Sequence, residues 1–187
     1  KRQDIIGGIP HYERTIDDAN FSIDYLCKLA ADRSLRVDMH CDENDDPHSR
    51  HIETLCKASI HYGLRDYVTG SHLTSMHSMD NAYAKKIISL IRKSKINVVS
   101  NPLINITLQG RNDSYPKRRG LTRIPELFLE EVNVAFGQDC VMDPWYPLGN
   151  GEMLDSAFMA LHAAQMTKES EILKCFEAVT YNGAKLM

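Results

Sequence analysis

The stretch Val37-Asp38-Met39-His40-Cys41-Asp42-Glu43 decides the fold class, because a short strand-like run ends on a histidine and, three residues later, a glutamate. A strand that stops at His40 would hold the imidazole at its carboxyl end. In α/β barrels this end is where active sites are built. A neutral imidazole can bind a metal ion there, while a nearby carboxylate transfers protons. The segment therefore predicts a parallel α/β protein with a functional site at the strand ends.

The same arrangement occurs twice more along the chain. The run at residues 66–72 ends on His72, and the run at residues 132–139 ends on Asp139. Each of these short apolar runs stops at a group that can coordinate a metal ion or exchange a proton. We expect the three strand ends to converge on one site.

Segments with helical spacing alternate with these strands. We predict helices at residues 16–30, 47–63, 81–95, 126–132, 153–164 and 170–178, further strands near residues 5–6 and 96–99, and a long basic loop after Asn101-Pro102. Such alternation indicates parallel strands joined by right-handed crossovers, in an open doubly wound sheet or a barrel. Functional groups at several strand ends favour the barrel.

The number of strands bears on how much of a barrel is present. Four or five strands are predicted, whereas a closed barrel of this type has eight. We therefore predict an α/β chain that forms the C-terminal half of a TIM-like (β/α)8 barrel, as one partial domain over residues 1–187. Its first and last strands should then have edges that residues outside the chain cover. Glycine-rich phosphate loops are absent from the sequence, which argues against a nucleotide-binding fold.

Composition narrows the class of partner. The chain has 187 residues, of which 43% are hydrophobic and 25% charged, and a net charge of -3. This composition indicates a soluble globular protein large enough to form a hydrophobic core. The longest basic cluster is Lys117-Arg118-Arg119, too short for a nucleic-acid partner. The five cysteines include no Cys-x-x-Cys pair, so we expect reduced thiols, a cytoplasmic location and no disulfide. Since no apolar run reaches the ~20 residues that cross a bilayer, no membrane partner is expected.

Several longer motifs carry a family resemblance. They are His40-Cys41-Asp42-Glu43, Ser71-His72-x-x-x-Met76-His77, Asn101-Pro102-Leu103-Ile104-Asn105, Leu108-Gln109-Gly110-Arg111, Tyr115-Pro116-Lys117-Arg118-Arg119-Gly120 and Asp143-Pro144-Trp145-Tyr146-Pro147-Leu148-Gly149. In this order they resemble the bacterial cytosine deaminases of the amidohydrolase superfamily, over nearly the whole chain. The resemblance implies a distorted (β/α)8 barrel of the metal-dependent hydrolase type, with one divalent metal ion, Fe2+ or Zn2+.

The resemblance also implies which residues hold that metal ion. His40 corresponds to the ligand from strand five and Asp139 to the ligand from strand eight. The family's His-x-His pair from strand one is absent from these residues. We therefore expect about strands 4 to 8 here, with the N-terminal strands and a small β-sandwich domain outside this chain.

By resemblance, the activity is hydrolytic deamination of a free pyrimidine base in pyrimidine salvage, converting cytosine and water into uracil and ammonia. Glu43 would carry a proton to the ring nitrogen and then to the leaving amine, and it would contact the substrate. His72 would orient or deprotonate the attacking water, and Asp139 would bind metal and accept a proton. Trp145 would form a pocket wall. The family also suggests a homo-oligomer.

Cys140 departs from the family pattern, in which many members have a second aspartate directly after the metal ligand. A thiol is less polar than a carboxylate and donates only weakly. A softer wall near C5 of the base would favour 5-methylcytosine, another substituted pyrimidine or a triazine. A further alternative is a non-catalytic truncated barrel, because two ligands alone would hold a catalytic metal ion poorly.

Other histidine and acidic motifs have simpler interpretations. Residues 42–53 resemble an EF-hand loop, but Pro47 occupies the sixth position, where glycine is needed. We expect His48 and His51 to lie on a solvated helix face, since no third ligand follows at a suitable spacing. His11 is expected at the surface, and His77 is expected to be a packed or capping histidine.

Overall fold

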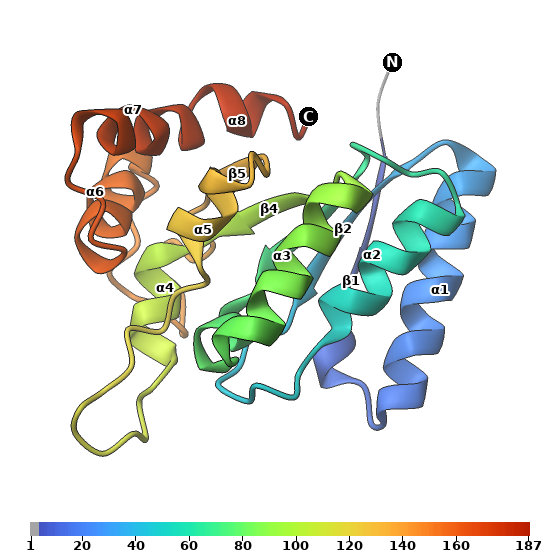
Figure 1. The fold of residues 1–187 in the computed structure, drawn as a ribbon, viewed down its shortest axis with the longest axis horizontal. Helices are drawn as coiled ribbons and strands as arrows, with labels where there is room; N and C mark the ends of the chain where they lie inside the picture. The colour runs from blue at the N-terminus through green and yellow to red at the C-terminus, as the bar shows by residue number, and fades with distance from the viewer. Residues whose placement is uncertain (1–3) are drawn as a thin grey trace.

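A computed structural model describes residues 4–187, which form one sheet of five parallel strands in the order β1-β2-β3-β4-β5 (Figure 1). The strands are β1 (Ile5–Gly8), β2 (Arg36–Cys41), β3 (Val68–His72), β4 (Asn97–Ser100) and β5 (Val134–Phe136). Each strand pairs with its neighbour in sequence, as in a barrel wall, whereas a doubly wound sheet reverses its strand order. The barrel-type α/β prediction therefore fits the topology.

Helices connect the strands. They are α1 (Ile16–Arg33), α2 (His51–His61), α3 (Asn81–Ser94), α4 (Pro102–Leu108), α5 (Ile124–Leu129), α6 (Met153–Ala163), α7 (Glu169–Ala178) and α8 (Tyr181–Ala184), with 3-10 turns η1 (Pro10–Tyr12) and η2 (Thr74–Ser78). Helices α1, α2 and α3 lie side by side across one face of the sheet (Figure 1). Helices α6, α7 and α8 pack beside β5.

Local capping explains where the long helices begin. The Thr15 hydroxyl accepts a hydrogen bond from the Asp18 amide at 3.1 Å at the start of α1. The Asp80 carboxylate accepts one from the Tyr83 amide at 2.9 Å at the start of α3. Such side chains satisfy amide groups that have no partner within the helix. Both helices agree closely with the sequence prediction.

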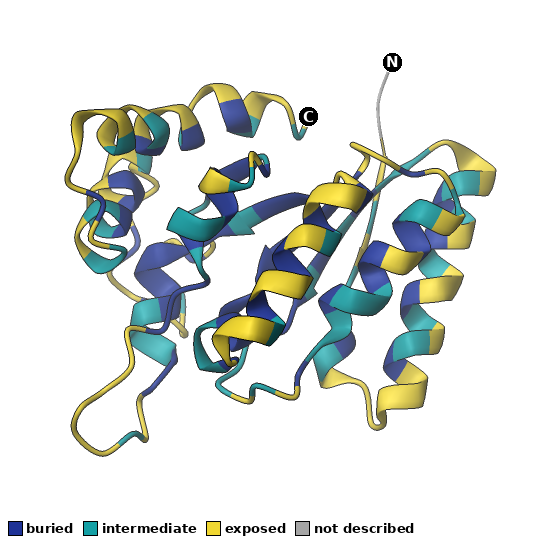
Figure 2. Cartoon of the chain, in the orientation of Figure 1, coloured by how far each residue is buried: buried dark blue, intermediate teal, exposed yellow. Residues whose placement is uncertain are grey.

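The core lies between the sheet and the helices (Figure 2). In β2, Val37, Met39 and Cys41 are buried, whereas Asp38 and His40 alternate with them and are only partly buried. Successive strand residues point to opposite faces of a sheet. The Ser71 hydroxyl donates to Asp38 at 3.0 Å, which links the polar face of β2 to that of β3. One face of the sheet therefore builds the core, and the other carries the polar groups.

The segment between β2 and α2 differs from the prediction. Helix α2 begins at His51 instead of Pro47, because the preceding residues form side-chain-stabilised turns. The Asp46 amide donates to the Asn44 side chain at 3.0 Å, and the His48 amide donates to the Asp46 side chain at 2.8 Å. Asparagine and aspartate favour such turns over a helix.

Short elements near the C-terminal half differ as well. Helix α4 lies where a loop was expected, so the basic loop is confined to residues 109–123. Helix α5 begins two residues earlier than predicted, helix α8 was not predicted, and β5 ends at Phe136, before Asp139. Most of α4 is buried, so it lacks the polar stripe that marks a surface helix.

Two further expectations concern thiols and membrane spans. All five cysteines are unpaired and buried in the structure. Within residues 4–187, none of the helices combines the length and the apolar character that a bilayer span requires.

Candidate active site

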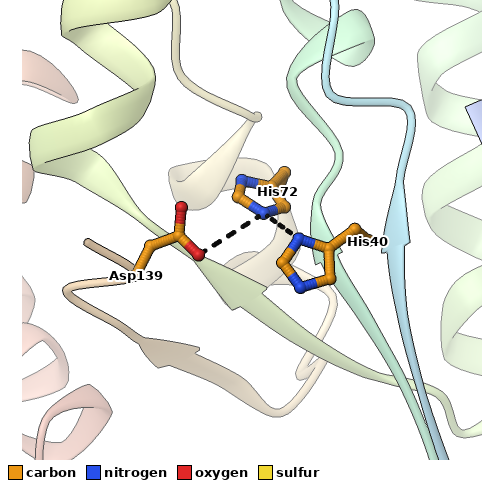
Figure 3. Close-up of side chains that lie close together, drawn as sticks. All are labelled: His40, His72 and Asp139. Carbon is orange, nitrogen blue, oxygen red and sulfur yellow. Dashed lines mark hydrogen bonds and ion pairs between the residues drawn. The ribbon is translucent and has the colours of Figure 1, made fainter. Parts of the chain in front are cut away.

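Three predicted residues meet at the carboxyl edge of the sheet (Figure 3). His40 is the last residue on the polar face of β2, His72 ends β3, and Asp139 follows β5. One ligand atom from each lies within 4.8 Å of the others. His72 Nε2 is 2.9 Å from His40 Nδ1 and 4.0 Å from Asp139 Oδ1. Two imidazole nitrogens and a carboxylate form a donor set that suits Zn2+ or Fe2+.

Left-handed backbone turns aim the site residues. Asp42, His72 and Asp139 have φ values of 55°, 72° and 68°, although none is glycine. Each of these residues follows or ends a strand, where the chain must leave the sheet sharply. Residues other than glycine adopt this conformation at a cost, and such positions cluster at functional sites.

Glu43 reaches the same site from the turn after β2. Its Oε1 lies 3.1 Å from His72 Nδ1, and its side chain is 15% exposed. Burial, together with the negative charge of Asp139, raises the pKa of Glu43 to about 7. Burial and the neighbouring His40 lower the pKa of His72 to about 3. At neutral pH the contact is therefore a hydrogen bond between a neutral imidazole and a partly protonated carboxyl group, not a salt bridge.

Two asparagines from the segment after β4 complete this polar cluster. The Asn105 side-chain nitrogen lies 3.0 Å from His72 Nδ1 and 3.4 Å from Glu43 Oε1. The Asn101 side-chain nitrogen lies 3.2 Å from His72 Nδ1. Sequence reasoning did not select either residue as a site residue. Their position after the end of the fourth strand was a signal in the sequence. An amide carries no charge and cannot titrate, so neither asparagine stands out as a histidine or a carboxylate does.

A buried aspartate anchors the turn between His40 and α2. Asp42 is fully buried and accepts hydrogen bonds from the Ser49 hydroxyl at 2.8 Å, the Ile52 amide at 2.9 Å and His51 Nδ1 at 2.7 Å. Burial alone would raise the pKa of Asp42, but the hydrogen bonds from His51 and from the amide of Ile52 lower it. The expectation that His51 lies on a solvated face is wrong, because its side chain is only 12% exposed and is held by Asp42. His48 is exposed in a turn.

A second histidine differs from its prediction. His11, in η1, is partly buried, and its Nδ1 lies 3.2 Å from the backbone oxygen of His40. The surface assignment is wrong because η1 folds back over β2. His77 is packed as expected, with Nε2 2.9 Å from Asp45.

Comparison with known proteins identifies the family to which this chain belongs. Residues 4–187 match the sequence model of the amidohydrolase family. The chain belongs to the amidohydrolase family.

This amidohydrolase chain also resembles solved structures and curated relatives. It is 46% identical to a 5-methylcytosine deaminase from Klebsiella pneumoniae liganded with 5-fluorocytosine, with a TM-score of 0.95 over 98% of this chain and 44% of that chain. It is 31% identical over 147 residues to a pterin deaminase from Rhizobium rhizogenes (strain K84), covering 78% of this chain and 33% of that protein. An N-isopropylammelide isopropylaminohydrolase from Burkholderia multivorans, 18% identical over 97% of this chain and 43% of that chain, has a TM-score of 0.79 and shares the fold.

These matches confirm the predicted family resemblance and the fold class. The amidohydrolase chain spans about a third of the length of the pterin deaminase and under half of the length of the 5-methylcytosine deaminase. The prediction that it comprises about strands 4 to 8 stays a prediction.

The two residues predicted to line the substrate pocket of this amidohydrolase differ in their placement. Cys140 is 8% exposed, and its Sγ lies 3.7 Å from Asp139 Oδ2. Burial and the nearby carboxylates raise the pKa of Cys140 to about 12, so the thiol is neutral at neutral pH. Trp145 is 69% exposed. Its predicted contact with a base stays a prediction.

Proposed function

We propose that the gene product containing this chain is a metal-dependent aminohydrolase that deaminates a free pyrimidine base. The observation that carries this proposal is the meeting of His40, His72 and Asp139 within 4.8 Å, with Glu43 against His72. Membership of the amidohydrolase family supports it, as does 46% identity to a 5-methylcytosine deaminase. The partner in this proposal is a small molecule, and a homo-oligomer stays a prediction.

The residues present fit a divalent metal ion. His72 is neutral and the site combines nitrogen and oxygen donors, as Zn2+ and Fe2+ require. His40 and Asp139 would hold the ion, with further ligands from outside these residues. When bound, it would lower the pKa of a water molecule from ~15.7 to about 7, making a nucleophile available at neutral pH.

The side chains of the chain itself would move the protons. A carboxyl group with a pKa of about 7 exists in both forms at neutral pH, so Glu43 can protonate the ring nitrogen and later the leaving amine. A neutral His72 can orient the attacking water or accept its proton. Asp139 can accept a proton as well, because burial raises its pKa. Water adds to the carbon that bears the amine, and ammonia leaves.

Ammonia release by the full-length gene product, supplied with Fe2+ or Zn2+ and a panel of pyrimidines, tests this function. We expect turnover by the wild type and a loss of about 100-fold or more in kcat for Glu43→Gln, the size typical of a lost acid–base group. Glu53→Gln is the matched control, because Glu53 lies on α2 and its carboxylate accepts hydrogen bonds from Lys57 and Tyr83. An inactive wild type with a full metal content would support the non-catalytic alternative instead.

Cys140 favours a second, narrower candidate, a preference for 5-methylcytosine over cytosine. A neutral, nearly buried thiol beside Asp139 offers a less polar wall than a second carboxylate would. We expect kcat/KM to be higher for 5-methylcytosine, and Cys140→Asp to shift the ratio toward cytosine. A ratio that Cys140→Asp leaves unchanged would contradict this preference while leaving the deaminase proposal intact.

A further inference from the structure

One buried hydroxyl group holds the turn that carries Glu43. Thr74, in η2, is fully buried, and its Oγ1 lies 3.1 Å from the Asp42 carbonyl oxygen and 3.2 Å from the Asn44 carbonyl oxygen. A carbonyl oxygen can only accept, so the single hydroxyl hydrogen is shared between the two. These carbonyls belong to the residues directly before and after Glu43. The hydroxyl therefore fixes the backbone on both sides of this glutamate.

The next residue of η2 holds the same turn. The Ser75 amide donates to the Asp42 carbonyl at 3.0 Å, and the Ser75 hydroxyl donates to the Ser49 carbonyl at 2.8 Å. The Asp42 carbonyl therefore keeps one donor if the Thr74 hydroxyl is removed. Among residues 4–187, by contrast, the Asn44 carbonyl has Thr74 as its only donor. Loss of the hydroxyl should therefore loosen the turn after Glu43.

Two left-handed residues bring Thr74 to this position. His72 and Leu73 have φ values of 72° and 51°, so the chain turns sharply at the end of β3. The Leu73 amide donates to the Cys41 carbonyl at 3.0 Å, which holds the start of η2 against the end of β2. Residues other than glycine adopt this conformation at a cost and persist in it only where the surrounding structure fixes them. The contact between η2 and the turn after β2 is therefore built into the backbone.

Asp45 ties the turn a second time, two residues after Glu43. Its Oδ1 lies 2.9 Å from His77 Nε2, and its Oδ2 accepts from the Gly110 amide at 2.8 Å. The segments that follow β2, β3 and β4 are therefore joined at this carboxylate. Its side chain is 32% exposed, so water can replace part of this tie. Water cannot reach the buried hydroxyl in η2, which makes that hydroxyl the stronger restraint.

The position of the Glu43 carboxyl group depends on this restraint. The carboxyl group has only two side-chain contacts among the described residues, with His72 Nδ1 at 3.1 Å and with the Asn105 side-chain nitrogen at 3.4 Å. A shift of the backbone would move the carboxyl group with it. A misplacement of about 1 Å can lower turnover about 100-fold, even when the altered residue lies away from the reacting atoms.

We propose that Thr74 is a positioning residue, whose hydroxyl group holds the turn at residues 42–45 so that the Glu43 carboxyl group faces His72. Its effect on turnover rests on the proposed function, whereas its hold on the turn does not.

Three variants separate the hydroxyl from its surroundings. Thr74→Val removes the hydroxyl and keeps the branched shape of the side chain. Thr74→Ser keeps the hydroxyl and is the rescue variant. Thr122→Val is the matched control, because Thr122 is also buried, at 3% exposed, but its hydroxyl donates to the Met76 sulfur at 3.6 Å instead of to the turn.

The kinetic test uses the full-length, metal-loaded gene product. For Thr74→Val we expect kcat to fall about 30-fold with an unchanged metal content and KM to stay within about threefold, because Glu43 moves while the rest of the site stays in place. Thr74→Ser should restore kcat to within about fivefold of the wild type, and Thr122→Val should stay within about threefold. If Thr74→Val does not fold, Asp45→Ala carries the test, since it removes the partly exposed tie of the same turn. We expect it to lower kcat about tenfold.

The second measurement needs no substrate. Hydrogen–deuterium exchange reports on the turn through the Asp46 and Ser49 amides, which donate hydrogen bonds within it. Exchange over residues 42–49 should be about tenfold faster in Thr74→Val, and about tenfold faster in Asp45→Ala if that variant is used, but close to wild type in Thr74→Ser and Thr122→Val.

The outcomes separate the two proposals. Unchanged exchange over residues 42–49 in Thr74→Val, or an active wild type whose kcat this variant leaves unchanged, would overturn the inference. Losses in Thr74→Ser or Thr122→Val as large as those in Thr74→Val would overturn it as well, because the hydroxyl would then not be the cause. An inactive wild type with the expected exchange pattern would instead refute the proposed function alone.

Discussion

Replacing Glu43 with glutamine should stabilise the metal-free protein relative to the wild type, by an amount that grows as the pH rises. The folded state raises the pKa of Glu43 from 4.5 to about 7, chiefly through burial. Between these values the folded protein binds more protons at this site than the unfolded chain does, so the contribution of Glu43 to stability is present below pH 4.5 and is lost toward pH 7. Glutamine does not titrate and loses nothing over this range.

The pKa values set the size of the effect. At about 1.36 kcal/mol per pH unit, this shift corresponds to about 3 kcal/mol in the free energy of unfolding. The side chain is only 15% exposed, so solvent screens little of this effect. His72, whose pKa is lowered, acts in the opposite direction between about pH 3 and 6.5, but it is present in both proteins and cancels in the comparison.

The assay is denaturant unfolding of wild type and Glu43→Gln at half-unit steps from pH 4 to 8, with a chelator present. The free energy of the variant minus that of the wild type should rise by about 3 kcal/mol across this range. Glu53→Gln should give a nearly flat difference above about pH 5 and the opposite trend only toward pH 4, because hydrogen bonds from Lys57 and Tyr83 lower the pKa of Glu53 from 4.5. A difference for Glu43→Gln that stays flat or falls with pH would refute the assignment of Glu43 as a buried carboxyl group that resists ionisation.

Three further outcomes follow from the structure. Asp42→Asn should lower stability by about 3 kcal/mol in denaturant unfolding, because buried donors at α2 lose their acceptor; an unchanged midpoint would contradict this. Gly137→Ala should lower both Tm and kcat, since the added Cβ would collide with Asn101 Oδ1, whereas the Cβ of Gly183→Ala meets nothing within 4 Å and should leave both unchanged. Arg118→Ala should speed proteolytic cleavage within the basic loop, which Arg118 ties to the turns after β2 and β3; an unchanged cleavage rate would count against that role.

The sequence predicts the regular part of the fold well. Helices α1 and α3 are long, keep helical spacing and start at capping residues, so pattern and local chemistry agree. Helix α4 has seven residues and is mostly buried, so it lacks the polar stripe by which a surface helix is recognised in a sequence. Strand β5 has only three residues, and a period of two cannot be read from so few.

The candidate site also has residues that the sequence predicts and contacts that it does not. His40, His72 and Asp139 could be selected because titratable groups stand at strand ends or a few residues after them. The hydrogen bonds of Asp42 to His51, nine residues later, depend on how the turn before α2 folds. The packing of His11 against the His40 backbone depends on the path of η1 across β2. Contacts of this kind follow from tertiary structure, which residue spacing does not encode.

The left-handed turns at Asp42, His72 and Asp139 limit how this scaffold can be made more robust. Glycine would relieve roughly 1–2 kcal/mol of backbone strain at Asp139, so a search guided by thermal stability alone would favour it there. That gain would remove a carboxylate from the candidate site. At Asp42 and His72, the loss of buried hydrogen bonds outweighs the relief of strain. Engineering for heat tolerance should therefore exclude these three positions from the outset and concentrate on the outer helical layer, where α1 and α3 present most of their exposed surface.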